Sequence, residues 1–282
     1  MLSIRLLLFP ALLLALTACS QAPLTTLQEQ LPAERQLIVL DTPTFPLLAG
    51  VDRKAITSAQ LRVYIEGDGR AWITPSQPSL DPTPQDSWFA RLALEDPQPS
   101  AWLARPCQYV SNASCEVGMW THGRFSAAVV AAMSQALDQL KQRYGSQHLE
   151  LIGYSGGAAI ALLLASQRDD VIAVQSLAGN LSPRLWSQQL GLSPLYDSLD
   201  PLDAIDKLEH LPQRHLLGQQ DKVVPADLAG QWQHTLRSSP CVEQITIAGA
   251  DHWHGWQAAW RQWRAHPLKS ESLDSCRRRN ND

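Results

Sequence analysis

Residues 148–164 read HLELIGYSGGAAIALLL, and this stretch decides the fold. An apolar run suited to a buried strand (149–152) ends at Gly153, and a run of small apolar residues suited to a packed helix begins at Gly156. Between them, GYSGG matches the pattern G-x-S-x-G at a strand-to-helix junction. Such a turn leaves no room for side chains two residues before and after the serine, and it lifts the Ser155 hydroxyl off the sheet. The alternative is a glycine-rich turn in which Ser155 only caps the helix.

Two later stretches supply an acid and a base for this serine. Asp221 follows a predicted strand at 215–218, and His252 follows another at 244–248. An alcohol is a poor nucleophile until an imidazole takes its proton and a carboxylate orients that imidazole. Because strands of a parallel sheet end at one edge, Ser155, Asp221 and His252 are predicted to meet there.

Each partner also has a simpler interpretation. Asp221 is equally suited to a turn or to capping a helix that starts near Pro225. His254 is an alternative base, which would leave His252 as a surface residue. Asp251, His252 and His254 could together bind a metal, but they do not provide three well-placed ligands. We therefore predict no metal and no cofactor.

Other apolar runs alternate between strand and helix patterns. Strands are predicted at 36–40, 61–65, 102–104 and 171–177, and a helix is predicted from Ser126 to Gly145. The segment 73–100 is rich in Pro, Ser and Asp and is predicted to be a long loop bordering the site. Four tryptophans (253, 256, 260 and 263) have the spacing of one helix face. The alternation predicts an α/β fold with a mainly parallel sheet covered by helices on both faces, in one domain at 35–282 with a candidate cap at 181–200.

Composition bounds the class of partner. The chain has 282 residues, is 45% hydrophobic and carries a formal net charge of −4. It is long enough to bury a sizeable core. A slightly acidic chain gives no reason to expect nucleic acid as a partner, and the sequence says nothing of the oligomeric state.

The amino-terminal residues have the pattern of an export signal. Arg5 precedes an apolar run at 6–16, and Leu16-Thr17-Ala18-Cys19 resembles the lipobox of bacterial lipoproteins. That resemblance implies a signal peptide at 1–18, acylation of Cys19 and, because Ser20 rather than Asp follows, an outer-membrane anchor facing the periplasm. Residues 19–34 are polar and are predicted to be a tether. The alternative is an ordinary signal peptide with an incidental cysteine.

Cysteine usage fits an oxidising compartment. Apart from Cys19, the chain has four cysteines, at 107, 115, 241 and 276, which allow three pairings. We favour Cys107–Cys115, which closes a short loop, and Cys241–Cys276, which ties down the carboxyl-terminal tail. Buried free thiols are the alternative.

These motifs together resemble the serine α/β-hydrolases, and more narrowly a group of bacterial lipoprotein-type members of uncertain substrate. The resemblance covers about residues 35–265 and rests on the sequences at 64–69 (YIEGDG), 81–84 (DPTP) and 105–109 (RPCQY), on the Ser155 turn, on Asp221 with Val224-Pro225, and on His252 with Trp256. It implies that the backbone N–H groups of Gly156 and Asp68 form an oxyanion hole. Glu66 and Asp68 depart from the esterase pattern, because they place carboxylates where negative charge would develop. The alternative for 67–69 is a plain glycine turn.

The sequence therefore predicts a serine hydrolase that cleaves small acyl esters through an acyl-enzyme, with Ser155 as nucleophile, His252 as base and Asp221 as its orienting acid. A peptidase of the same fold is the alternative among enzymes. A lipid-anchored envelope protein that uses the fold only as a binding scaffold is the alternative outside enzymes.

Overall fold

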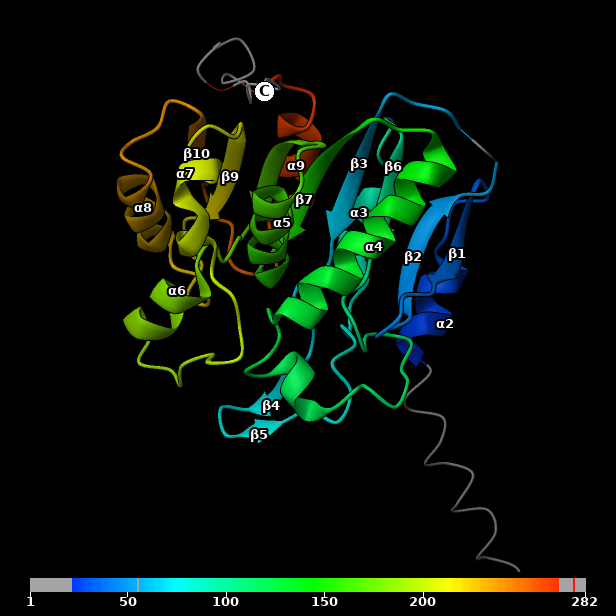
Figure 1. The fold of residues 1–282 in the computed structure, drawn as a ribbon, viewed down its shortest axis with the longest axis horizontal. Coiled ribbons are helices and arrows are strands. Elements are labelled where there is room, and N and C mark those ends of the chain that lie inside the picture. The colour runs from blue at the N-terminus through cyan, green and yellow to red at the C-terminus, as the bar shows by residue number, and fades with distance from the viewer. Residues whose placement is uncertain (1–21, 55, 269–275, 277–282) are drawn as a thin grey trace, which may run out of the picture.

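An eight-stranded sheet forms the centre of the molecule (Figure 1). The computed structural model describes residues 22–54, 56–268 and 276. The strand order is β1-β2-β6-β3-β7-β8-β9-β10. The pairs β1–β2 and β2–β6 are antiparallel, and every pair from β6 to β10 is parallel. The predicted mainly parallel sheet is confirmed.

The strands of the large sheet are β1 (Arg35–Leu40), β2 (Leu47–Asp52), β3 (Gln60–Ile65), β6 (Ser100–Leu103), β7 (His148–Tyr154), β8 (Val171–Leu177), β9 (Gln213–Gly218) and β10 (Val242–Ile247). A separate hairpin contains β4 (Trp72–Thr74) and β5 (Gln77–Pro78). The helices are α2 (Ala22–Glu29), α3 (Trp88–Leu94), α4 (Ala127–Tyr144), α5 (Gly156–Gln167), α6 (Pro183–Gln189), α7 (Ile205–Leu208), α8 (Ala226–Thr235) and α9 (Trp256–Trp263). Two short 3₁₀ helices are η1 (Val117–Trp120) and η2 (Pro201–Ala204).

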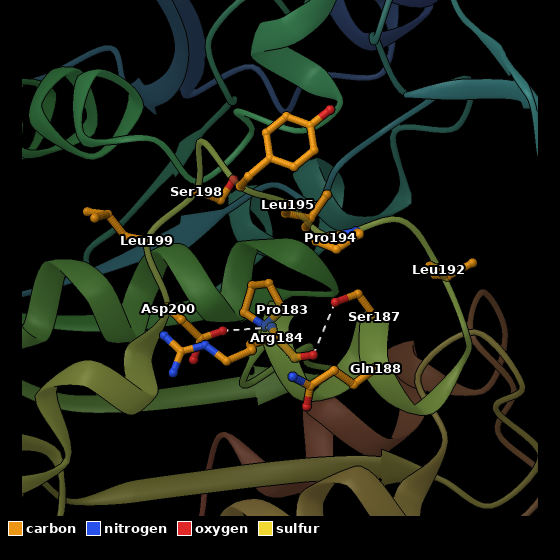
Figure 2. Close-up of a pocket in the computed structure, with 11 residues that line it drawn as sticks. Pro183, Arg184, Ser187, Gln188, Leu192, Pro194, Leu195, Ser198, Leu199 and Asp200 are labelled. Carbon is orange, nitrogen blue, oxygen red and sulfur yellow. Dashed lines mark hydrogen bonds between the residues drawn. The ribbon is translucent and has the colours of Figure 1, made fainter.

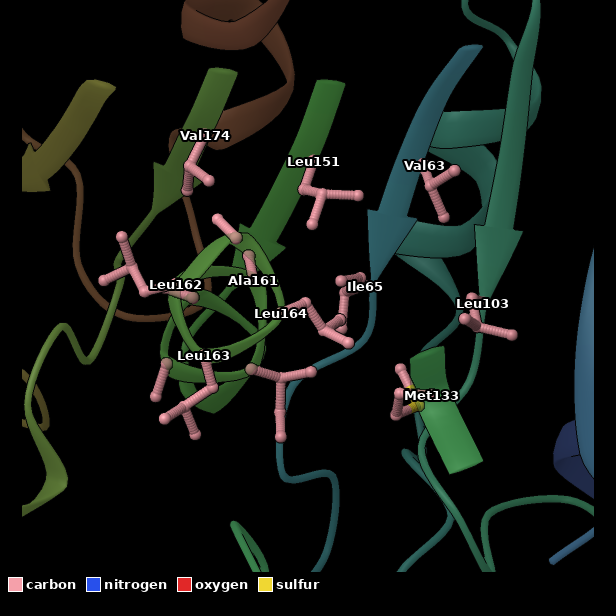
Figure 3. Packing of buried hydrophobic residues seen from close by; sticks show 14 of the residues in the cluster. Val63, Ile65, Leu103, Met133, Leu151, Ala161, Leu162, Leu163, Leu164 and Val174 are labelled. Atoms are coloured by element: carbon pink, nitrogen blue, oxygen red, sulfur yellow. The ribbon is translucent and has the colours of Figure 1, made fainter. Parts of the chain in front are cut away.

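Helices cover both faces of the sheet, as predicted. Side chains of α4, α5 and α8 share one buried cluster with the strands, and those of α2, α3 and α9 share a second cluster. Figure 3 shows part of the first cluster, in which Ile65 of β3, Leu151 of β7 and Val174 of β8 lie toward α5, and Leu103 of β6 lies beside Met133 of α4. α5 is apolar on all sides because the sheet covers one side of it and α4 and α7 contact others.

The chain changes direction at β3, and this places the site. From β3 the chain passes through α3 to β6 on one side, and then returns through α4 to β7 on the other side of β3. Right-handed crossovers in opposite directions put their helices on opposite faces. The carboxyl ends of β3 and β7 therefore mark the topological switch point of the sheet, which is where ligands bind in open α/β sheets.

The helix predicted from Ser126 to Gly145 is confirmed at both ends. The Ser126 hydroxyl accepts a hydrogen bond from the Val129 N–H at 3.4 Å, and Gly145 ends the helix in the left-handed conformation (φ 60°). Both predicted disulfides are also present, joining Cys107 to Cys115 and Cys241 to Cys276.

One strand was not predicted, and two expectations are corrected. Residues 47–52, which contain Gly50 and follow Pro46, form the fully buried strand β2. The predicted loop at 73–100 contains α3, whose side chains at 88–90 and 92–94 are buried because they cover the sheet next to β6. Trp253 precedes α9 and is 57% exposed, because Gly255 adopts φ 91° at the start of that helix.

The tether predicted for residues 19–34 is corrected where the structure describes it. Residues 22–29 form α2, and Leu27 is fully buried against the second cluster. Leu24, one turn earlier on α2, and Leu31, just after the helix ends, pack against the same cluster. The predicted signal peptide at 1–18 and the acylation site Cys19 lie outside the described residues. Within the described ranges, no helix is long and apolar enough to cross a membrane.

Candidate active site

The turn between β7 and α5 has the strained geometry that its sequence predicts. Ser155 has φ 51° and ψ −123°, a conformation that costs free energy for a residue with a side chain. A Cβ atom at Gly153 would lie 2.4 Å from the Ala158 backbone nitrogen, and one at Gly157 would lie 2.3 Å from the Ile65 carbonyl oxygen. Only glycine fits at either position, so the turn presents Ser155 at the sheet edge.

Ser155, His252 and Asp221 form one hydrogen-bonded chain. The His252 Nε2 atom lies 3.0 Å from the Ser155 hydroxyl oxygen, and its Nδ1 atom lies 2.8 Å from Asp221 Oδ2. His254, the alternative base, bonds to Asp251 at 2.9 Å, and its side chain is 80% exposed. The structure therefore brings together the three residues that the sequence predicts, with His252 as the histidine that reaches the serine.

The Asp221 carboxylate is held from two sides. Its second oxygen, Oδ1, accepts hydrogen bonds from the backbone N–H groups of Val223 and Val224, both at 2.8 Å. The side chain has no exposed surface. Because an ionised carboxylate can only accept hydrogen bonds, His252 must carry its proton on Nδ1, which leaves Nε2 free to accept the Ser155 proton.

The backbone of His252 is also fixed. Its carbonyl oxygen accepts hydrogen bonds from the Tyr154 hydroxyl at 2.9 Å and from Trp256 Nε1 at 3.1 Å. Burial raises the pKa of Tyr154, so this hydroxyl stays protonated and remains a donor. Tyr154 precedes the serine directly, so one turn places the nucleophile and anchors its base.

The two residues predicted to bind an oxyanion through their backbone amides, Asp68 and Gly156, lie next to each other near Ser155. A Cβ atom at Gly67 would lie 3.3 Å from the Ser155 Cβ, and one at Gly156 would lie 2.1 Å from Asp68 Oδ1. Gly156 is the first residue of α5, where N–H groups have no partner within the helix and the helix dipole is positive. The structure therefore places Asp68 and Gly156 side by side at the nucleophile.

Two arginines bind the Asp68 carboxylate, and the sequence did not assign them this role. Arg124 Nη1 lies 2.7 Å from Asp68 Oδ2, and Arg105 Nη1 lies 3.3 Å from Oδ1. Arg105 also donates to the Arg124 carbonyl oxygen. Both guanidinium groups are nearly fully buried. Asp68, Arg105 and Arg124 together carry a formal charge of +1, so the carboxylate next to Gly156 is more than neutralised.

Glu66 shapes the turn that precedes Asp68. Its Oε1 accepts a hydrogen bond from the Gly67 N–H at 3.0 Å, and its Oε2 accepts one from Trp102 Nε1 at 2.9 Å. Burial raises the pKa of Glu66 to about 7, and the two hydrogen bonds oppose this shift. The second carboxylate that departs from the esterase pattern is therefore buried beneath the turn and bonds to it.

The candidate cap at 181–200 lies beside the site. Figure 2 shows a pocket, with a volume of about 290 Å³, between α6 and the segment that follows it, where the Arg184 N–H donates to Asp200 at 2.7 Å. Trp186 Nε1 donates to the Val223 carbonyl at 2.7 Å, and the Arg124 guanidinium lies 5.7 Å from the Trp186 ring centre. Trp186 thus connects the loop that holds the acid to the arginines that hold Asp68, a role that its sequence position does not signal.

The described residues contain no group of three or more His, Cys, Asp and Glu side chains that could hold a metal ion. Asp251 and His254 pair with each other on the surface.

Comparison with known proteins identifies the fold. No protein-family model matches the chain, and no curated protein sequence is significantly similar to it. Among solved structures, the esterase Pf2001 of Pyrococcus furiosus is similar, with 14% identity, a TM-score of 0.59, and coverage of 82% of this chain and 89% of that chain. Est1E of Butyrivibrio proteoclasticus has 16% identity and a TM-score of 0.56, over 85% of this chain and 98% of that chain. An alpha-beta serine hydrolase homologue from Coxiella burnetii has 18% identity and a TM-score of 0.53, over 81% and 94%.

These similarities and the strand order show that the chain has the α/β-hydrolase fold. At such low identity they show the fold alone. The reaction has to be argued from the site.

Proposed function

We propose that this protein is a serine hydrolase that cleaves carboxylic esters through an acyl-enzyme. The observation that carries the proposal is the continuous hydrogen-bonded chain from Ser155 through His252 to Asp221, on a strained turn at the switch point of the sheet. A chain in this order and geometry has what nucleophilic catalysis by serine requires.

The mechanism follows from the positions of the atoms. His252 Nε2 takes the Ser155 proton while the serine oxygen bonds to the substrate carbonyl carbon, and Asp221 stabilises the imidazolium that forms. The N–H groups of Gly156 and Asp68 donate to the developing oxyanion, next to the positively charged Asp68–arginine cluster. The imidazolium then protonates the departing alcohol. Water, deprotonated by His252, attacks the acyl-enzyme and releases the acid.

The choice of esters draws support from one structural neighbour, because Pf2001 is described as an esterase.

We further propose that the protein is a lipoprotein of the bacterial envelope, anchored by acyl chains on Cys19 in the outer membrane and facing the periplasm. The lipobox-like residues 16–19 support the anchor. The two disulfides fit an oxidising compartment such as the periplasm.

Labelling with a fluorophosphonate probe tests the reaction, because the probe reacts only with an activated serine. We expect the full-length protein in detergent to be labelled, and Ser155→Ala and His252→Ala to remain unlabelled. His254→Ala is the matched control and should label like the wild type, because that side chain is exposed and bonds only to Asp251 and its own turn. A folded wild-type protein that resists the probe would refute the proposal and favour a binding scaffold. If the wild type is labelled, its rates on esters and on matched anilides will separate an esterase from a peptidase.

A further inference from the structure

Exposed apolar side chains gather at the edge of the sheet that carries the site. In the described ranges, eleven large apolar side chains are more than a third exposed. Nine of them lie on segments that follow the carboxyl ends of parallel strands: Trp72, Ile73, Leu80, Val117, Leu190, Leu192, Tyr196, Leu199 and Trp253. We call these nine residues the apolar rim. The other two, Val39 and Ile56, lie on the edge strand β1 and in the turn between β2 and β3.

The segments of the rim contact one another. The ring of Tyr196 stacks on His122 with 5.2 Å between ring centres, and Trp120 Nε1 donates to the Ser79 carbonyl at 3.0 Å. These contacts join the segment after α6 to η1, and η1 to the hairpin β4–β5. Figure 1 shows the hairpin and the segment after α6 projecting beyond the lower ends of the strands. Trp253 brings the rim to the site, because its ring centre lies 5.3 Å from that of His252.

The chain enters the fold at the same edge. Leu24 and Thr25, in the first turns of α2, line a cavity of about 640 Å³ together with residues 80–83, which follow the hairpin. Arg35, at the start of β1, lies at the opposite edge, where it donates to the carbonyl of Ser100 at 2.8 Å. The chain therefore runs from Ala22, near the carboxyl edge of the sheet, to Arg35 at the amino edge.

The distance to the proposed anchor is short. Cys19 is three residues before Ala22, and three residues reach at most about 10 Å. Acyl chains on Cys19 would therefore hold this edge of the sheet, and no other, close to the bilayer surface.

We propose that the apolar rim rests on the membrane that carries the anchor, so that Ser155 faces the lipid interface and takes acyl esters dissolved in the bilayer as substrates. The inference rests on the proposed function, specifically on the acylation of Cys19 and the nucleophile Ser155. Apolar side chains held within reach of a bilayer insert into it because insertion removes their surface from water. Exposed acids (Glu116, Asp197) and bases (Arg70, Lys222) both lie around the rim, so the contact does not require anionic lipid.

Site-directed spin labelling of the full-length lipoprotein in phosphatidylcholine vesicles tests the contact. Leu80→Cys and Trp72→Cys place a label on the rim, and Ile56→Cys is the matched control because Ile56 and Trp72 are both 40% exposed. The four cysteines that the structure describes are all in disulfides, so the label reacts with the introduced thiol. We expect oxygen, which concentrates in lipid, to relax the two rim labels several-fold more than a water-soluble nickel complex does, and the reverse at residue 56.

Equal accessibility to nickel at all three positions would overturn the proposal. Labels on the rim that stay in water in pure vesicles but become immobile in native envelopes would show a protein partner instead, and would also overturn it. Mass spectrometry that finds no acyl chains on Cys19 would also overturn the proposal, because no anchor would then hold the apolar rim at the membrane.

A second measurement separates this inference from the proposed function. We expect the double variant Trp72→Asp with Leu80→Asp to hydrolyse a vesicle-embedded ester about tenfold more slowly, because charged side chains do not enter the interface. Its fluorophosphonate labelling and its rate on a water-soluble ester should stay at the wild-type level. Absence of labelling in the wild type would refute the hydrolase, whereas normal labelling with equal rates on vesicle esters would refute only the membrane contact.

Discussion

Replacing Asp221 with Asn tests the hydrogen-bonded chain more sharply than removing the side chain. One oxygen of Asp221 accepts from the N–H groups of Val223 and Val224, both at 2.8 Å. An amide at this position must keep its oxygen on these two donors, because its NH₂ group cannot accept hydrogen bonds. The NH₂ group then faces His252 Nδ1, where the carboxylate oxygen now lies at 2.8 Å.

That orientation reverses the tautomer of His252. The NH₂ group of the introduced amide would donate to Nδ1, so the ring proton would move to Nε2, which lies 3.0 Å from the Ser155 hydroxyl. A protonated Nε2 in a neutral ring cannot accept the serine proton. We therefore expect kcat/KM for a water-soluble ester to fall about 10⁴-fold, as it does when such an acid becomes an amide elsewhere, which corresponds to about 5.5 kcal/mol in the transition state.

The assay is ester hydrolysis by purified wild type and variant, with thermal unfolding to show that both are folded. Asp251→Asn is the matched control, because Asp251 also follows a strand and also pairs with a histidine, but on the surface. We expect that control to keep the wild-type rate. A loss of less than about tenfold in Asp221→Asn would refute the assigned tautomer and, with it, the role of His252 as base.

Two further predictions concern the carboxylates beneath and beside the oxyanion position. Because burial raises the pKa of Glu66 to about 7, from 4.5 in an unfolded chain, the folded protein binds this proton more tightly. The stability contributed by Glu66 is full below pH 4.5 and is lost as the pH rises through 7, a total of about 3 kcal/mol. Urea unfolding across this range should show that slope in wild type but not in Glu66→Gln, and equal slopes would contradict the assignment. We also expect Arg124→Gln to lower the rate of ester hydrolysis about tenfold, because it leaves the Asp68 carboxylate less compensated beside the oxyanion, and Asp68→Asn in the same chain to restore part of that rate. If the effects of Arg124→Gln and Asp68→Asn on the rate simply add in the double variant, the ion pair has no part in the rate.

Features of the fold that depend on neighbouring residues could be predicted from the sequence. The turn at Ser155 follows from glycines that crowding requires, and the helix α4 follows from its cap residue and its terminal glycine. The partners Asp221 and His252 could be predicted because each lies three to five residues after the end of a strand, and parallel strands deliver such residues to one edge. Each of these inferences needs only local pattern and one rule of topology.

Features that depend on distant contacts could not be predicted in this way. The strand β2 contains Gly50, where a Cβ atom would lie 2.8 Å from Leu94 Cδ2 and would push that side chain aside. The sequence around Gly50 therefore lacks the usual pattern of a strand. The pairing of Arg124 with Asp68 joins residues 56 positions apart, and nothing near either residue announces it.

The sequence therefore left Asp68 as an anomaly that only the structure could resolve. A free carboxylate beside Gly156 would repel the negative charge that acyl transfer places there, and it would oppose the positive end of α5. Two buried guanidinium groups reverse that sign, and they hold the side chain of the residue whose N–H is proposed to donate to the oxyanion. A neutral side chain at this position would leave two arginines buried without a counter-charge, which costs more free energy than the ion pair. The acid and its arginines are therefore best understood as one unit that positions a backbone donor, in which each charge is tolerated only because the others are present.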